Sequence, residues 1–194
     1  MIVMRHGDLM TLSEYRLTPE NDGVWDLIDG VLEKQPLATL VHQMVLGELL
    51  TRINEFTTAT DPSLGLGIRN IGVAFSESFA PTPDIVYARR EHFHLMRGSF
   101  MEGTPDLLVE VLSQDRDRDL VRKRDRYAAA GVPEYWIVDP DNEIILVLEL
   151  SEGQYVDRTV RRTEALTTPT IPGFELSLER LFGHQFLAQL RENG

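Results

Sequence analysis

The sequence contains no cysteine, so disulfide bonds and thiolate metal sites are excluded. It has no apolar run near the ~20 residues that a membrane-spanning helix requires. Residues 1–6 lack the basic start and long apolar segment of a signal peptide. A phosphate-cradling glycine loop is missing as well, and the five histidines follow no zinc-binding spacing. These absences indicate a cytoplasmic protein without a membrane partner.

Positive charge is scarce, because 19 Lys and Arg stand against 31 Asp and Glu and give a net charge of −12. This balance argues against indiscriminate nucleic-acid binding, since phosphate backbones require basic partners. Basic residues nevertheless gather locally, at Arg116, Arg118, Arg122, Lys123, Arg124 and Arg126. The cluster has two interpretations: a solvated helix surface interleaved with acids, or a face that contacts phosphate through Arg122 and Arg126.

The hydrophobic and turn patterns predict one mixed α/β domain over residues 1–194, long enough for a substantial core. Asp29-Gly30 is a strong two-residue turn signal and predicts a β-hairpin over residues 24–34. Helices are expected at 11–17, at 38–56, at 116–130 after a capping cluster at 113–115, and after Gly173. Strands are expected at 65–68, 71–75, after Asp84, 107–112, 135–138, 143–150 and 155–159, with loop or a short helix at 89–104.

Two acidic residues stand on or beside apolar strands. Glu110 is flanked by Val109 and Val111, and Asp84 stands at the entry of another strand. Burying an unpaired carboxylate is expensive, and a divalent cation that takes oxygen ligands is one reason to do so. Asp106 competes with Asp84, but at ~3.3 Å per residue it lies about 13 Å from Glu110 along one strand. Neighbouring strands lie only ~4.8 Å apart, so Asp84 and Glu110 are the better metal pair.

A longer pattern surrounds Glu110. It reads Pro-Asp-Leu-Leu-Val-Glu-Val-Leu-Ser over 105–113, continues with Lys123 and Tyr127, and ends with Gly-Val-Pro-Glu-Tyr-Trp-Ile-Val-Asp-Pro over 131–140. This block closely resembles the Uma-type family, long catalogued as a bacterial domain of unknown function and grouped with the PD-(D/E)XK nucleases. Weaker matches lie at residues 30–33, at His42 and at Pro83-Asp84. The resemblance implies a restriction-endonuclease-like fold, a central mixed β-sheet flanked by helices, here with an N-terminal β-hairpin.

The resemblance also implies a site for Mg²⁺ or Mn²⁺, held by Asp84, Glu110 and the backbone carbonyl of Val111. The superfamily places a lysine two residues after the acid, where this chain has Leu112. Lys123 is the candidate substitute, because it borders the apolar face of the predicted helix and a lysine there can bury its stem.

Alternatively, Lys123 forms only a surface ion pair with Asp119. Glu33 and His42 form a second tier of site residues, in which a lone histidine is more often a structural hydrogen-bonding group. Asp106 belongs to the same tier, either holding the local turn or taking a water-mediated or second-metal role. Large aromatic side chains are expected in the core, namely Tyr127, Tyr135 and Trp136.

The expected function is a metal-dependent endonuclease that hydrolyses phosphodiester bonds, with DNA as substrate by analogy to the superfamily. Asp84 and Glu110 would bind the metal, and Lys123 would stabilise or orient the attack. The alternative is a nuclease-like scaffold without turnover, used for binding or dimerisation, which Leu112 and the acidic composition favour. A homodimer would use edge strands, for which 143–150 and 155–159 are the candidates.

Overall fold

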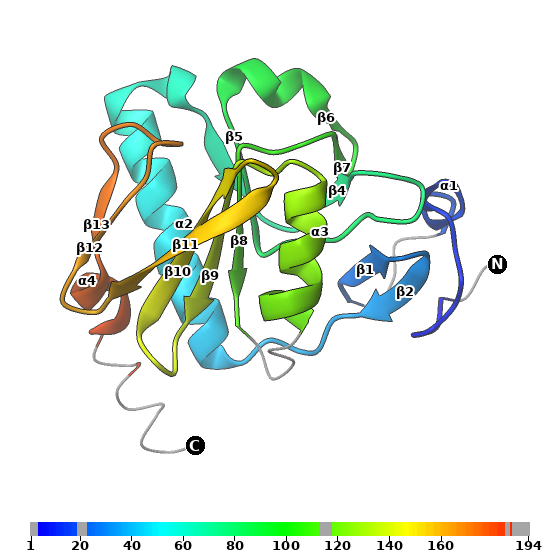
Figure 1. The fold of residues 1–194 in the computed structure, drawn as a ribbon, viewed down its shortest axis with the longest axis horizontal. Helices are drawn as coiled ribbons and strands as arrows, with labels where there is room; N and C mark the ends of the chain where they lie inside the picture. The colour runs from blue at the N-terminus through cyan, green and yellow to red at the C-terminus, as the bar shows by residue number, and fades with distance from the viewer. Residues whose placement is uncertain (1–3, 19–22, 113–117, 185–186, 188–194) are drawn as a thin grey trace.

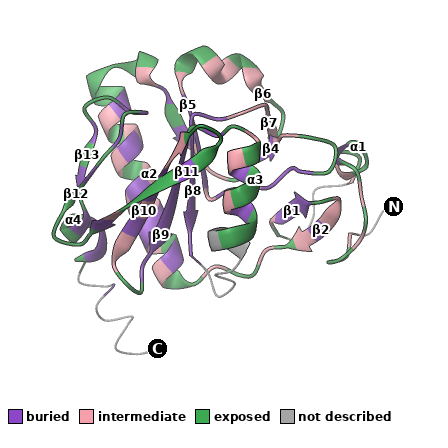
Figure 2. Ribbon diagram, in the orientation of Figure 1, coloured by how far each residue is buried: buried purple, intermediate pink, exposed green. Residues whose placement is uncertain are grey.

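A six-stranded mixed sheet forms the centre of the computed structural model, which describes residues 4–18, 23–112, 118–184 and 187 (Figure 1). Its strands run in the order β11 (Gln154–Arg161), β10 (Ile144–Ser151), β9 (Glu134–Asp139), β8 (Leu107–Val111), β5 (Ile85–Ala88) and β3 (Leu66–Ile68). Strands β8 and β9 are parallel, and the other neighbouring pairs are antiparallel. Every residue of β8 and β9 is buried (Figure 2), as expected for strands covered on two faces.

Helix α2 (Leu40–Thr60) covers one face of this sheet, where its apolar side chains pack on Val109 and Trp136. Thr39 caps its first turn, accepting a hydrogen bond from the amide of His42. The sequence predicts this helix over 38–56, but it continues to Thr60. The physical stop is Pro62, which disfavours helical backbone at Asp61 and starts the short 3₁₀ turn η1 (Pro62–Leu64).

The opposite face is covered by a π-helical segment, η3 (Arg118–Lys123), that continues into helix α3 (Arg124–Ala129). Tyr127 of α3 packs in the same buried cluster as Leu108, Leu112 and Tyr135. The expected helix at 116–130 is therefore found from residue 118 onward. Its predicted capping cluster at 113–115 and first residues lie outside the described part of the chain.

An antiparallel hairpin lies beside α3 (Figure 1), formed by β1 (Trp25–Ile28) and β2 (Val31–Lys34). Its turn residues Asp29 and Gly30 have φ values of 55° and 77°, which a two-residue hairpin turn of this hand requires. The predicted hairpin is confirmed. The short helix α1 (Leu12–Tyr15) precedes it, closed by a capping box between Thr11 and Glu14.

Two small sheets complete the fold, and the sequence analysis missed most of their strands. One joins β4 (Gly72–Ala74), β7 (Phe100–Glu102) and β6 (Met96–Arg97), next to the 3₁₀ segment η2 (Arg90–Leu95). The other joins β12 (Ala165–Thr167) and β13 (Glu175–Ser177) and leads into α4 (Leu178–Phe182). Strands of two or three residues are too short for a visible alternation, which explains why 89–104 was expected as loop or short helix.

The candidate dimer strands need one correction. Strand β10, expected at 143–150, is not an edge strand, because it pairs with β9 on one side and β11 on the other. Only β11 of the two lies at the sheet edge, and most of its residues are exposed (Figure 2). The mixed sheet, its two helical covers and the hairpin confirm the predicted restriction-endonuclease-like fold class. Among the described residues, no helix combines the length and apolarity needed to cross a membrane.

Candidate active site

Glu110 lies near the carboxyl end of β8 and is only 4% exposed. The Lys123 ammonium, itself fully buried, donates a hydrogen bond to Glu110 Oε1 over 2.7 Å. The Tyr127 hydroxyl donates to the same oxygen over 3.0 Å. Lys123 and Tyr127 stand four residues apart, so the start of α3 presents two donors on one face.

Burial, and then the negative charge of Glu110, raises the pKa of Tyr127 well above its ordinary value. The hydroxyl therefore stays protonated and keeps donating to the carboxylate. Lys123 and Glu110 form a buried ion pair, for which desolvation cancels much of the attraction. Such a pair is a poor device for stability alone, and this favours a role for it beyond folding.

Asp26 is a third charged member of this cluster, and the sequence analysis missed it. It lies on β1, is fully buried, and places Oδ2 3.6 Å from Lys123 Nζ. The signal that marks Glu110 is present here too, since Asp26 stands between the apolar residues Trp25 and Leu27. It was overlooked because alternate positions of a hairpin usually face solvent. In this fold α3 covers that position.

Asp84 comes immediately before β5, the strand that neighbours β8. Ile85 pairs with Val109, so Asp84, one residue before β5, falls beside the Glu110 end of β8. The carboxylate of Asp84 accepts a hydrogen bond from the Val111 amide over 2.8 Å and lies 3.1 Å from His42 Nε2. His42 thus orients Asp84 from the first turn of α2.

The donor set around Glu110 fits a hard divalent cation. Such an ion takes one or two carboxylates and completes its shell with water and substrate oxygens, and Asp84 and Glu110 offer two carboxylates from neighbouring parts of the sheet. Within the described ranges, no group of three or more His, Cys, Asp or Glu side chains is arranged to hold a metal.

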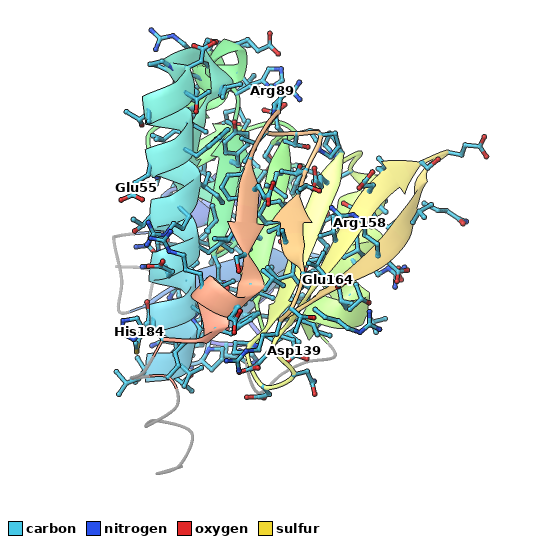
Figure 3. All side chains as sticks on the ribbon, turned by 90° about the vertical axis from the view of Figure 1, so that its left-hand side faces the viewer. Glu55, Arg89, Asp139, Arg158, Glu164 and His184 are labelled. Atoms are coloured by element: carbon cyan, nitrogen blue, oxygen red, sulfur yellow. The ribbon has the colours of Figure 1, made fainter. Side chains whose placement is uncertain are left out.

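Asp106 lies at the opposite end of β8 and is not brought to this cluster. Its carboxylate accepts a hydrogen bond from the Arg89 amide over 2.8 Å and lies 2.8 Å from His92 Nδ1. Figure 3 labels Arg89 near this end of the sheet and Asp139, which ends β9, near the other. Asp106 therefore fastens the segment after β5, as a turn-holding residue would.

Two arginines of the helical segment pair with carboxylates of the hairpin, whereas Arg124 pairs with Asp157 of β11. Arg122 pairs with Glu33 over 2.9 Å, and Arg126 pairs with Asp29 in the hairpin turn. These exposed pairs neutralise much of the basic face that the sequence suggested.

Arg69 contrasts with the helix arginines. It donates to the side-chain oxygen of Gln43 over 2.8 Å, and Gln43 follows His42 on α2. Arg69 Nε is buried without a hydrogen-bond partner among the described atoms. Nothing in the sequence singled out Arg69, because its proximity to α2 depends on the tertiary fold.

The mixed sheet covered by helices on both faces, with its N-terminal hairpin, is a restriction-endonuclease-like fold. The family model described as "Putative restriction endonuclease", Uma2, matches residues 12–179, and the chain belongs to this family. Among solved structures, a "putative nuclease belonging to DUF820" from Anabaena variabilis has the same fold, with a TM-score of 0.78 and 18% identity. The match covers 90% of this chain and 98% of that one. A search of curated proteins found no match.

Proposed function

We propose that this protein is a metal-dependent endonuclease that hydrolyses phosphodiester bonds, with DNA as its substrate. The observation that carries the proposal is the buried contact between Glu110 and Lys123, next to Asp84 in the sheet register. Family membership supports a nuclease-like role. The choice of DNA and of Mg²⁺ or Mn²⁺ rests on analogy with the superfamily and on the oxygen donors of the site.

In this proposal Asp84 and Glu110 hold the cation, together with the backbone carbonyl of Val111. The bound cation would supply an activated water molecule and neutralise charge on the phosphate. Lys123 would direct its ammonium at the attacked phosphate, where negative charge builds up in the transition state. Tyr127 and His42 would keep Glu110 and Asp84 in place through the hydrogen bonds described above.

Substrate phosphates outside the reacting group need cationic contacts. Arg122 and Arg126 are candidates, but each would have to leave a hairpin carboxylate. Arg69 is the stronger candidate, because the partner described for it is the neutral amide of Gln43. Replacing each arginine in turn by glutamine identifies which of them contacts phosphate. Loss of one phosphate contact lowers the magnitude of the slope of log binding constant against log salt concentration by about one unit.

A second candidate function is a nuclease-like scaffold that binds without turnover. Leu112 stands where the superfamily has its lysine and is buried in an apolar cluster. The net charge of −12 also disfavours tight association with nucleic acid. This alternative predicts that the site takes up neither a divalent cation nor a substrate phosphate.

The deciding experiment incubates the purified protein with plasmid, single-stranded DNA and RNA, in Mg²⁺ or Mn²⁺ and in EDTA. We expect cleavage only with metal, and calorimetric Mn²⁺ binding that disappears in Asp84→Asn. A crystal soaked in Mn²⁺ should show anomalous density between Asp84 and Glu110. If no substrate is cut and no metal binds, the scaffold function replaces the nuclease.

A further inference from the structure

Hydrogen bonds hold the Asp26 carboxylate in one orientation, which a simple counter-ion for Lys123 would not require. Its Oδ1 accepts hydrogen bonds from the Thr82 amide over 2.7 Å and from Gln35 Nε2 over 3.0 Å. Gln35 Nε2 also donates to the Thr82 carbonyl over 2.8 Å. These neutral donors fix one oxygen, so the other keeps a defined direction toward Lys123.

The same anchor ties Asp26 to the metal side of the site. Thr82 lies two residues before Asp84, and its hydroxyl donates to the Trp25 carbonyl over 2.9 Å. These hydrogen bonds join the β1–β2 hairpin to the loop that precedes β5. A displacement of Asp84 would move Thr82, and with it the oxygen that faces Lys123.

Lys123 consequently lies between two carboxylates from different elements, 2.7 Å from Glu110 and 3.6 Å from Asp26. The three side chains carry two negative charges and one positive charge. A divalent cation on Glu110 would repel the ammonium, and Coulomb interactions are strong where water is excluded. The Asp26 carboxylate attracts the ammonium and would oppose this displacement.

We propose that Asp26 is a positioning residue for Lys123, the carboxylate that retains the ammonium in the site when Glu110 binds a cation. This inference rests on the proposed nuclease function for its catalytic meaning, but it concerns a contact that is measurable without catalysis. Asp26 touches neither substrate nor metal in this scheme. It acts through the lysine.

The chain offers a direct probe, because its two lysines are Lys34 and Lys123. Protein labelled with ¹⁵N at lysine Nζ gives two ammonium signals, which Lys34→Arg assigns. Lys34 is exposed, whereas Lys123 is buried and paired. We expect the protected Lys123 signal to persist when Mg²⁺ is added to the wild type. In Asp26→Asn it should be lost to solvent exchange on adding Mg²⁺.

Asp26→Asn keeps an oxygen for Thr82 and Gln35 while removing the charge. Asp29→Asn is the matched control, since it removes a carboxylate from the same hairpin at a position where asparagine tolerates positive φ. The control should leave the Lys123 signal unchanged. Gln35→Leu, which removes one anchor at a partly exposed residue, should give a weaker version of the Asp26→Asn result.

Kinetics distinguish positioning from a merely structural role. Asp26→Asn should lower kcat about tenfold with KM nearly unchanged, as for loss of one charge-assisted contact in the transition state. In a Lys123→Ala background the same change should have almost no effect on kcat. Equal losses in the two backgrounds, or a Lys123 signal that Asp26→Asn leaves unaltered with Mg²⁺, would overturn the proposal. If the wild type cleaves nothing, the nuclease function fails, and the ammonium signal alone decides the role of Asp26.

Discussion

Two buried glutamates on neighbouring parallel strands have opposite surroundings. Glu134 on β9 is 1% exposed and accepts hydrogen bonds from the Trp136 indole, Thr168 and Thr170. Glu110 on β8 is 4% exposed and faces the Lys123 ammonium and the Tyr127 hydroxyl. The described hydrogen-bond donors to Glu134 are neutral, whereas the Lys123 ammonium beside Glu110 also lies near a second acid, Asp26.

The difference separates a carboxylate that builds the fold from one whose surroundings fit the proposed chemistry. Glu134 joins β9 to the segment that follows β12, so its hydrogen bonds fix the C-terminal region. A neutral donor set cannot be exchanged for a metal without leaving buried hydroxyls unsatisfied. Lys123 carries the charge that a cation would otherwise supply, so the Glu110 cluster can trade one positive partner for another.

The largest expected effect is the loss of cleavage when Glu110, but not Glu134, is replaced by glutamine. Glu110→Gln should reduce metal-dependent cleavage to background, because it replaces an anionic ligand by a neutral one of the same shape. Glu134→Gln should leave kcat per folded molecule unchanged but lower the free energy of unfolding by about 1–3 kcal/mol, the cost of unsatisfied buried donors. Plasmid cleavage and urea unfolding measure the two effects. Cleavage that survives Glu110→Gln would place the activity at another site or in a contaminant.

A second prediction concerns the contribution of the Lys123 ammonium to the rate of cleavage. Lys123→Ala should lower kcat about 100-fold, as loss of a charge-stabilising donor does, while Mn²⁺ affinity by calorimetry stays within a few fold. Lys123→Arg should rescue only part of the rate, since the guanidinium is broader and shifts the charge.

Leu112 allows a test of whether a lysine next to β8 can replace Lys123. It directly follows β8, two residues after Glu110, and packs in the cluster that contains Tyr127, so Leu112→Lys in the Lys123→Ala background restores an ammonium near the acid. We expect partial recovery of kcat, with Leu112→Met as the packing control. A folded double variant without any recovery would contradict the idea that the helix lysine replaces the strand lysine.

The sequence could predict those features that depend on short-range pattern. The Asp29-Gly30 turn and the buried strand around Glu110 both follow from local backbone chemistry, and both are found. The convergence of Asp26 on Lys123 could not be predicted in this way. It requires the hairpin to pack against a helix nearly a hundred residues later, and no local periodicity encodes that contact.

The dependence on contacts distant in the sequence also explains why β10 was wrongly predicted as an edge strand and why the arginine contacts were not predicted. Whether β10 is central depends on β11 folding back beside it, and this is decided by the long antiparallel register from Ile144 to Ser151. Arg122 and Arg126 looked available for phosphate because their acidic partners, Glu33 and Asp29, lie far away in the sequence. Charge patterns within one helix say little about neutralisation by another element.

The smallest expected effect is a difference in alkaline stability between the two glutamate clusters. Burial and the charge of Glu110 raise the pKa of Tyr127, whereas the threonine hydroxyls and the indole on Glu134 do not titrate in the same range. An unfolded tyrosine ionises near pH ~10. Above that pH the unfolded chain loses the proton and the folded protein keeps it, so stability falls as pH rises. Below it, the contribution of Tyr127 is fully present.

Tyr127→Phe should therefore lower the free energy of unfolding by about 1 kcal/mol at neutral pH, through loss of one hydrogen bond, and flatten its decline above pH ~10. Burial also raises the pKa values of Tyr15 and Tyr87 to about 12, so part of the decline remains. Thr170→Val, the matched change on Glu134, should lower stability by an amount that does not vary with pH. Urea unfolding from pH 8 to 11 measures these slopes. An unchanged slope in Tyr127→Phe would mean that its proton is not held by the Glu110 cluster, and the contrast between the two glutamates would lose its electrostatic basis.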